Sequence, residues 1–330
     1  MAGRVSLKHV AAAAGVSPST ASRVLSGVDR NVDPELARRV REVCAELGYR
    51  VNAAARALRL QATGSVALLV PAIDNAYFAE LVAACSRRLD ADGRRLVTID
   101  TNENLASEVR QLGDMDRVLV DAVLVVPVDH RKSAPAIDDA MRNHTVVQVD
   151  RIAEGACAPS VRMDNAAGMA LLVEHLRAQG RRRIVLIDAQ ERSSSSIERA
   201  EAFRALAGAG DRVLPVPSYS MSSGAGAAAH LLADPGAVDA VICTADVIAV
   251  GMLTAMQHGG VRVPRDVAIA SFDGTALADV VAPGLTSLAS SVDAIVEASL
   301  AIVDGSGAED VVVTPSLVVR GSTAGGTAGS

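Results

Sequence analysis

Short polar side chains cluster close to the start of the chain, in residues 6–27, which read SLKHVAAAAGVSPSTASRVLSG. Ser17 and Pro18 are typical of a helix start, with a capping hydroxyl followed by proline at the first helical position. Three hydroxyls and one arginine follow on the same helix: Ser19, Thr20, Ser22 and Arg23. Hydroxyls can reach phosphates and an arginine fork matches the acceptors of guanine. These residues therefore have the chemistry of a helix that lies in a DNA major groove.

Two short helices joined at Gly15 are predicted to position these groups. One small apolar face would hold the two helices together: Val10, Ala11, Ala14, Val16, Ala21 and Val24. A third helix is predicted to begin at Asp33-Pro34-Glu35 and to end at Gly48. Its apolar positions follow a helical period: Leu36, Val40, Val43 and Leu47. A plain helical cap with a solvated face would show much of the same pattern.

Residues 6–27, together with VDPELARRVREVCAELGYRVNAAARALR at 32–59, resemble the headpiece and hinge of the lactose/galactose repressor (LacI) family. The match runs almost without gaps over residues 5–59, and Val51 departs from the proline of many members. The resemblance implies a helix-turn-helix headpiece at 1–50 and a hinge helix at 51–60. It also implies a transcriptional regulator, acting as a repressor, that binds a near-palindromic operator as a homodimer.

The resemblance assigns roles on the DNA. Arg23 is expected to contact a guanine, while Pro18 and Ser19 would set the operator preference. The expected phosphate partners are Ser17, Thr20, Ser22, Asn31 and Asn52. Two paired hinges would occupy the minor groove, where Leu58 wedges between base steps and Ala55 lets the hinge helices approach.

The charge of the chain is unevenly distributed. Residues 1–60 hold ten Lys and Arg against five Asp and Glu, whereas the rest holds 22 against 33. A basic head on an acidic body fits a polyanionic partner at one end. The four cysteines lie far apart without a C-x-x-C pair, which predicts buried, reduced thiols. No apolar signal segment or run of ~18 apolar residues occurs, so a cytoplasmic location is expected, without membrane contact.

After Gly64, apolar runs of strand length alternate with helical stretches, which predicts parallel sheets covered on both faces. The predicted strands are 66–70, 96–99, 122–126, 146–149, 184–187, 213–216, 240–243 and 267–270. The predicted helices are 76–91, 104–118, 134–143, 166–179, 197–207, 224–233, 246–258 and 292–303. Two doubly wound units that divide near Ser160–Asn165 fit this length better than one sheet does.

The family resemblance implies that these units are two lobes of periplasmic-binding-protein type, in an effector-binding and dimerisation domain at 61–321. Lobe 1 would comprise about 61–160 plus 291–318, and lobe 2 about 161–290 plus 319–321. The composition of residues 322–330 predicts a flexible tail.

Carboxylates and aromatic rings gather just after the predicted strands, where open α/β sheets bind ligands. The expected effector-binding residues at these ends are Tyr77, Phe78, Asp150, Tyr219, Asp246 and Asp273, and the family resemblance adds Arg199. Aromatic rings can stack on the ligand, and carboxylates can accept hydrogen bonds from its hydroxyls. Such a site would bind a small polar metabolite, a sugar or sugar derivative. A nucleoside or purine-type corepressor is the alternative, and any single aspartate here can instead be a helix cap.

Enzyme signals are weak, and no catalytic residue, cofactor or metal site is expected. Gly224–Ala229 fits a loose dinucleotide fingerprint, but no strand directly precedes it, so a nicotinamide-dependent enzyme is a remote alternative. The serines at 193–196 are interpreted as a mobile polar rim of the cleft, because no nucleophile motif surrounds them. The histidines are dispersed, without zinc spacing. A solute-binding receptor would need an export signal and would lack the basic head.

Overall fold

The computed structural model describes residues 5–25, 32–49, 63–115, 120–189, 192–234, 236, 238–289 and 291–324. The chain divides into two compact units, Met1–Thr63 and Gly64–Ser330, which are called the head and the body below. No helix within these described ranges is long and apolar enough to cross a lipid bilayer.

The head consists of the helices α1 (Leu7–Ala14), α2 (Pro18–Leu25) and α3 (Pro34–Glu46). Gly15 ends α1 in the left-handed conformation, at φ 69°. The Ser17 hydroxyl accepts a hydrogen bond of 3.0 Å from the backbone N–H of Thr20, as expected of a helix cap. The Asp33 carboxylate caps α3 in the same way, accepting from the N–H of Glu35 at 2.8 Å. The predicted helix starts are confirmed.

A small apolar core joins the three helices of the head. Its buried members are Val10, Ala11, Ala14, Ala21, Val24, Ala37 and Val40. In α3 the prediction from Leu36 and Leu47 is wrong, since these side chains are 40% and 38% exposed. Ala37 and Val40, three residues apart, instead face the other helices, because a small side chain at 37 lets α3 pack closely.

The body contains two six-stranded sheets. The first has the order β11-β5-β4-β3-β1-β2 and is entirely parallel. Its strands are β1 (Ser65–Val70), β2 (Arg95–Asp100), β3 (Ala122–Val125), β4 (Thr145–Val149), β5 (Ser160–Met163) and β11 (Asp310–Val313). The second has the order β12-β10-β9-β8-β6-β7, with β12 antiparallel to β10. Its strands are β6 (Ile184–Ala189), β7 (Arg212–Val216), β8 (Ala240–Cys243), β9 (Ala268–Asp273), β10 (Thr286–Ala289) and β12 (Ser316–Val318).

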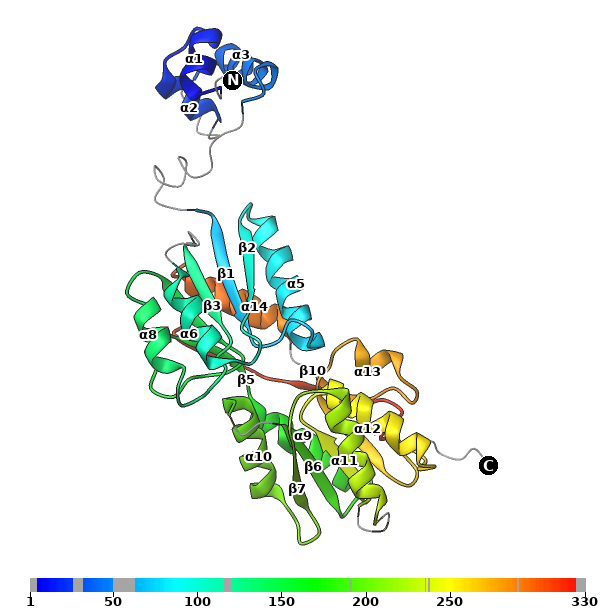
Figure 1. Ribbon diagram of the computed structural model, residues 1–330. Coiled ribbons are helices and arrows are strands. Elements are labelled where there is room, and N and C mark those ends of the chain that lie inside the picture. The colour runs from blue at the N-terminus through cyan, green and yellow to red at the C-terminus, as the bar shows by residue number, and fades with distance from the viewer. Residues whose placement is uncertain are drawn as a thin grey trace. The chain divides into compact units, whose positions relative to one another are not determined.

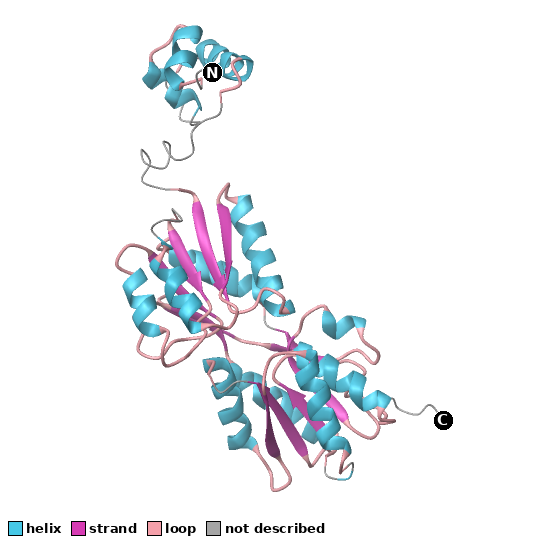
Figure 2. Cartoon of the chain, in the orientation of Figure 1, coloured by secondary structure: helices cyan, strands magenta, loops and turns pink. Residues whose placement is uncertain are grey.

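Helices cover both faces of each sheet (Figures 1 and 2). The first sheet carries α5 (Ala76–Ala91), α6 (Leu105–Gly113), α8 (Ala134–Ala140) and α14 (Val292–Val303). The second carries α9 (Asn165–Ala178), α10 (Ser194–Leu206), α11 (Met221–Leu232), α12 (Asp246–His258) and the short α13 (Leu277–Val280). The predicted doubly wound fold in two lobes is thereby confirmed, because continuous apolar strands are buried from both sides.

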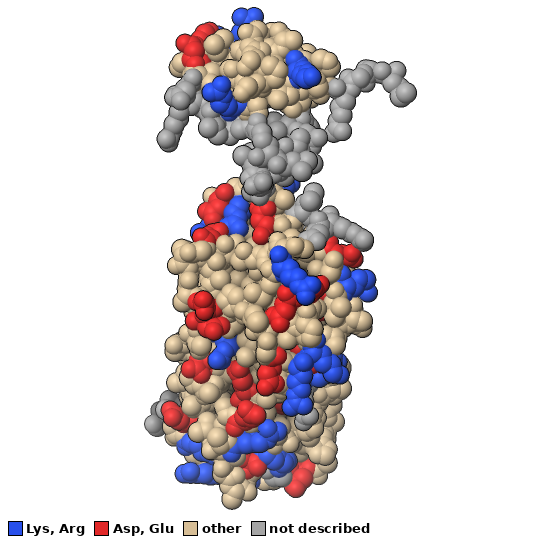
Figure 3. All heavy atoms as spheres, turned by 90° about the vertical axis from the view of Figure 1, so that its left-hand side faces the viewer, with Lys and Arg blue, Asp and Glu red and all other residues tan. Residues whose placement is uncertain are grey.

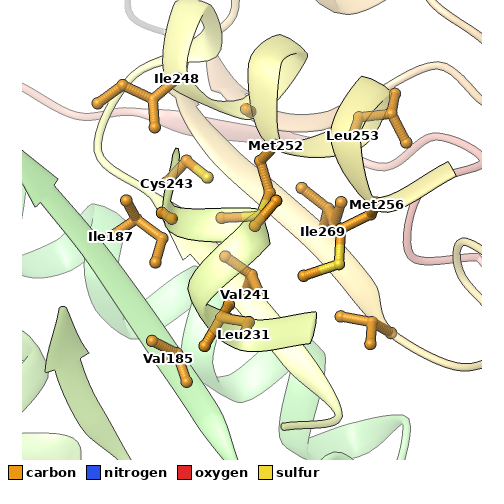
Figure 4. Packing of buried hydrophobic residues seen from close by; sticks show 14 of the residues in the cluster. Val185, Ile187, Leu231, Val241, Cys243, Ile248, Met252, Leu253, Met256 and Ile269 are labelled. Atoms are coloured by element: carbon orange, nitrogen blue, oxygen red, sulfur yellow. The ribbon is translucent and has the colours of Figure 1, made fainter. Parts of the chain in front are cut away.

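The core of the second lobe illustrates how this burial is achieved (Figure 4). Strand side chains such as Val185, Val241 and Ile269 meet Leu231 of α11 and Met252 of α12. All five are at most 2% exposed. With only six aromatic residues in the chain, aliphatic side chains and methionines fill this space.

Two glycines bring α11 and α12 into close contact. A Cβ on Gly224 would lie 2.0 Å from the carbonyl oxygen of Ile248, and one on Gly251 would lie 2.0 Å from that of Met221. Gly224 lies inside α11 rather than in a turn between a strand and a helix. The dinucleotide interpretation of residues 224–229 is therefore wrong, since these residues serve helix packing.

The chain passes between the lobes three times, after β5, after β10 and after β11. Residues 316–318 were expected in lobe 1, but they pair with β10 in the second sheet. Strand β5, at 160–163, belongs to the first sheet. Both β11 and β12 are short, half-exposed edge strands, and only their hydrogen bonds decide which sheet each one joins.

The last described residues are docked on the body, which corrects the prediction of a tail from residue 322. Ser322 and Thr323 are fully buried. The Ser322 hydroxyl donates to the carbonyl of Ile269 at 2.6 Å and accepts from the N–H of Thr286 at 2.8 Å. Residues 325–330 lie outside the described part of the chain. Small polar residues resemble a linker in composition, and here their hydroxyls complete the hydrogen bonding of β9 and β10.

The remaining surface features concern thiols and charges. Cys85 and Cys243 are buried as predicted, whereas Cys157 is exposed and Cys44 is half-buried, and all four are free thiols. Acidic and basic side chains are interspersed over the face of the body drawn in Figure 3. Many of them pair locally, as Arg262 does with Asp266 at 2.6 Å. Such exposed pairs contribute little to stability.

Candidate functional site

The head presents the predicted DNA-contacting side chains on one side of α2. Pro18, Ser19 and Arg23 are exposed, whereas Ala21 and Val24 are buried against α1 and α3. At ~100° per residue, positions 18, 19, 22 and 23 share an arc about 140° wide, opposite the buried pair. The arginine and the hydroxyls are thus available to a partner without any loss of core packing.

Two of the predicted phosphate partners interact with each other. The hydroxyls of Ser17 and Thr20 lie 2.9 Å apart, which follows from the role of Ser17 as the cap of α2. A helix N-terminus with such groups favours a negatively charged partner. Asn31, Asn52, Ala55 and Leu58, the other residues assigned to DNA, lie outside the described residues.

The body holds a small cavity between its two lobes, at the carboxyl ends of the strands. Its lining residues are Asn75, Tyr77, Phe78, Asp150, Arg151, Ser195, Arg199, Tyr219, Thr244, Ala245 and Asp273. They follow β1 and β4 in the first lobe and β6, β7, β8 and β9 in the second. Parallel strands bring these ends together, so residues more than 70 positions apart meet here.

Six of the seven expected effector residues line this cavity: Tyr77, Phe78, Asp150, Arg199, Tyr219 and Asp273. Asp246 is the exception. Its carboxylate accepts hydrogen bonds from the hydroxyls of Ser271, Ser287 and Thr275 at 2.5, 2.7 and 2.9 Å, and from the N–H of Thr275 at 2.7 Å. These four bonds saturate both oxygens, so Asp246 ties β9, β10 and α12 together behind the cavity wall.

Two aspartates of the cavity have unusual backbones. Asp150 has φ 64° and Asp273 has φ 102°. Residues other than glycine rarely adopt positive φ angles. Strained residues of this kind persist where the surrounding structure fixes them, and they concentrate at functional sites. Both backbones turn sharply just where the strands end, which directs the carboxyl groups into the cavity.

The Tyr77 hydroxyl donates a hydrogen bond of 3.0 Å to Asp150. Burial, together with the carboxylates of Asp150 and Asp273, raises the pKa of Tyr77 well above its usual value, so the phenol keeps its proton. Burial also raises the pKa of Asp273 to about 8, although Arg199 acts in the opposite direction. At neutral pH, Asp273 is therefore mostly protonated and uncharged.

Arg199 lies deep in the second lobe, with 5% of its surface exposed. Its Nε donates to the side-chain oxygen of Asn165 and its Nη1 to the carbonyl of Thr244, both at 2.7 Å. The guanidinium stacks on Phe272, 4.3 Å from the ring centre. Phe272 therefore holds the Arg199 guanidinium in place.

Residues 193–196 are buried, so the interpretation as a mobile rim is wrong. Ser193 caps α10, and the Ser196 hydroxyl donates to Asp188 at 2.8 Å. The Ser194 hydroxyl accepts a hydrogen bond of 2.8 Å from the N–H of Ile152 in the other lobe. The serine run therefore begins α10 and joins the lobes.

Three polar atoms of the cavity are buried without a hydrogen-bond partner of good geometry: Nε of Arg151, the hydroxyl of Tyr219 and Oγ1 of Thr244. Buried polar groups are nearly always paired. Three unsatisfied ones in a single cavity indicate a place where a polar ligand binds. Arg151 and Thr244 were not among the expected effector residues, although both lie beside strand ends.

The lobes are closed over the cavity, whose volume is ≈ 20 Å³, about the space of one water molecule. Several contacts span the closed lobes. Asp129 pairs with Nε of Arg192 at 3.2 Å, and the N–H of Ala276 donates to Glu80 at 3.0 Å. A ligand of sugar size can enter only when these contacts open. No group of three or more metal-binding side chains occurs among the described residues.

Comparison with known proteins agrees with both parts of the chain. The family "Bacterial regulatory proteins, lacI family" matches residues 6–52, and the "Periplasmic binding protein-like domain" matches residues 173–323. A solved structure of the lac repressor dimer bound to operator and the anti-inducer ONPF has a TM-score of 0.86 at 23% identity. It covers 97% of this chain and 99% of that chain, and it shows the shared fold.

Two curated relatives cover most of the chain. The HTH-type transcriptional regulator GntR of Pseudomonas aeruginosa is 33% identical over 319 residues, which are 93% of this chain and 92% of the relative. The ribose operon repressor of Haemophilus influenzae is 30% identical over 287 residues, 86% of each chain. Both relatives are transcriptional regulators rather than enzymes. With the headpiece, the two-lobed body and this degree of identity, the chain belongs to the lacI family of bacterial DNA-binding transcriptional regulators.

Proposed function

We propose that this protein is a repressor that binds a near-palindromic operator as a dimer and releases or tightens its grip when a small polar metabolite enters the cavity of the body. The observation that carries the proposal is the cavity itself, with three buried polar atoms that lack a hydrogen-bond partner of good geometry. Relatives named as repressors, and a related structure described as a dimer on its operator, support the DNA-binding half.

The proposed mechanism couples closure of the lobes to the head. The chain passes between the lobes three times, so a bound ligand can change the angle between the lobes. In a dimer, this change would alter the distance between the two copies of Gly64, the residue at which each first lobe begins directly after the head. A ligand shifts this equilibrium only by its difference in affinity for the two forms. In the head, Arg23 is assigned to a guanine, and the hydroxyls of Ser17, Thr20 and Ser22 to phosphates.

Footprinting on the promoter region next to the gene of this protein tests the proposal. An inverted repeat should be protected, and a small metabolite should change that protection at fixed protein concentration. Tyr219→Phe removes a hydroxyl whose interaction with Ser193 is not a hydrogen bond of good geometry, so it should weaken the metabolite response while the footprint without metabolite stays the same. Absence of any protected inverted repeat, with or without metabolites, contradicts the proposal.

A further inference from the structure

The cavity contains two buried guanidinium groups that lack strong anionic partners. Arg151 is 3% exposed, and its two terminal nitrogens face the Glu103 carboxylate, each at 3.4 Å. Charge-assisted pairs are normally ~2.7–2.9 Å long. The third donor of Arg151, Nε, has no partner at all. A buried cation held this loosely has a strong preference for an additional anion.

Arg199 is in a similar position. Its two hydrogen-bond acceptors, the Asn165 side chain and the Thr244 carbonyl, are both uncharged. No ion pair of Arg199 with a carboxylate occurs in the described part of the chain. The Asp188 and Asp273 carboxyls interact with Arg199 without forming an ion pair, and burial raises the pKa of both.

The aromatic rings of the cavity support these cations. The guanidinium of Arg151 lies 5.3 Å from the ring centre of Phe78 and 5.8 Å from that of Tyr219. Phe272 stacks on Arg199 in the same way. Rings were expected from the sequence to stack on a sugar, yet each of these rings has one face against a guanidinium. The arrangement fixes two positive forks in a nearly dry cavity.

We propose that the metabolite is a small polyol with an oxyanion, a carboxylate or a phosphate, which Arg151 and Arg199 bind. Its hydroxyls would pair with the Asp150 carboxylate and with the hydroxyls of Tyr219 and Thr244, which make no hydrogen bond of good geometry. This inference rests on the proposed function, because it names the ligand class of the same cavity.

Glu103 faces the two terminal nitrogens of Arg151, although it is not among the residues that line the cavity. Glu103 and its neighbour Asn102 have φ values of 51° and 54°, so a left-handed turn after β2 holds this carboxylate against the arginine. The Glu103 side chain is 24% exposed, so it reaches Arg151 from the solvent side. An incoming oxyanion would therefore compete with Glu103, and removal of the Glu103 charge should strengthen ligand binding.

Calorimetry and thermal shift with matched probes test the proposal on the full-length protein. Gluconate and galactonate are each compared with the parent aldose, and glucose 6-phosphate supplies the phosphate arm. At least one oxyanion should bind ten or more times tighter than its neutral parent, and its affinity should fall as salt increases. The tighter of the carboxylate and phosphate arms identifies the oxyanion. Equal or tighter binding of a neutral aldose overturns the proposal, as does failure of every oxyanion probe to bind.

Two variants with opposite expected effects make the test independent of folding problems. Arg151→Gln should weaken oxyanion binding at least tenfold, and Glu103→Gln should strengthen it severalfold without changing the affinity for neutral aldoses. Glu154→Gln, an exposed residue of the first lobe, is the control and should change neither. If Glu103→Gln weakens oxyanion binding or leaves it unchanged, Arg151 is not the anion site.

The outcome also separates this inference from the proposed function. If a neutral sugar or a nucleobase changes the operator footprint while the oxyanions do not, the ligand class is wrong and the proposed function stands. If no probe of any class changes the footprint, both are contradicted.

Discussion

The head and the body place their functional groups in opposite environments. In the head, Pro18, Ser19 and Arg23 project from an exposed helical arc, and the small core beneath them does not depend on their identity. In the body, Arg151, Arg199 and Asp273 are buried parts of the fold that lines the cavity. Recognition and stability are therefore separable in the head and coupled in the body. The four predictions below test this difference.

The largest effect is expected from Gly224→Ala. The added Cβ would meet the backbone carbonyl of Ile248 at 2.0 Å, so α11 must move away from α12, at a cost of about 3 kcal/mol in the free energy of unfolding. Gly226→Ala is the control on the exposed face of the same helix, where no atom lies within 4 Å, and it should stabilise by ~0.5–1 kcal/mol. Denaturant unfolding of both variants provides the measurement.

Arg23→Ala should weaken operator binding by ~1–3 kcal/mol, or about 5- to 150-fold, because one bidentate base contact is lost. Its thermal unfolding should match that of the wild type, since the side chain is exposed. Arg39→Ala removes the same charge from an exposed position of α3 and should affect operator and random DNA alike. A large loss of stability in Arg23→Ala would break the contrast between head and body.

Asp273→Asn should change how stability depends on pH. The pKa of Asp273 is about 8 in the folded protein and near 3.8 when unfolded, so the folded state binds more protons between these values. The contribution of Asp273 to the free energy of unfolding is fully present below pH 3.8 and is lost as the pH rises through 8. The variant should unfold like the wild type at acidic pH and a few degrees higher near pH 8.

Melting curves across this pH range give the comparison. Asp293→Asn, whose carboxylate is on a side chain that is 82% exposed, should follow the wild-type profile. Identical profiles for Asp273→Asn and the wild type would show that this carboxyl is ionised throughout.

The smallest effect is expected from Thr244→Val. The variant removes a buried hydroxyl whose interaction with the Asp188 carboxyl is not a hydrogen bond of good geometry, so the unliganded protein should gain up to ~1 kcal/mol while ligand affinity falls. Thr254→Val removes a hydroxyl that bonds the Val250 carbonyl at an exposed site, and its stability should stay within ~0.5 kcal/mol of the wild type. A destabilised Thr244→Val protein would mean that its hydroxyl has a partner within the fold.

The sequence predicted most of the head because its signals are local. Caps at Ser17 and Asp33 and the turn at Gly15 act within a few residues, so their effect can be read directly. The error at Leu36 arose because a helical period allows two adjacent stripes, and only the packing of α1 and α2 selects Ala37 and Val40.

In the body the sequence predicted the alternation of strands and helices but missed β5, β10 and α13, each of which has only four residues. Six of the seven expected effector residues line the cavity because strand ends converge there. Asp246 lies behind the cavity wall, and its hydrogen bonds with Ser271, Thr275 and Ser287 depend on contacts 25 to 41 residues away. The pairing of Arg151 with Glu103, 48 residues apart, could not be predicted from the sequence either.

The positions of β11 and β12 have a consequence for the order of events during synthesis. Each sheet obtains an edge strand from residues 310–318, and the second also needs the hydroxyl of Ser322. A growing chain is made from its N-terminus, so the head can fold while translation continues. The body must wait until residues 310–322 have been made, and during that interval both of its incomplete sheets expose pairing edges to other chains.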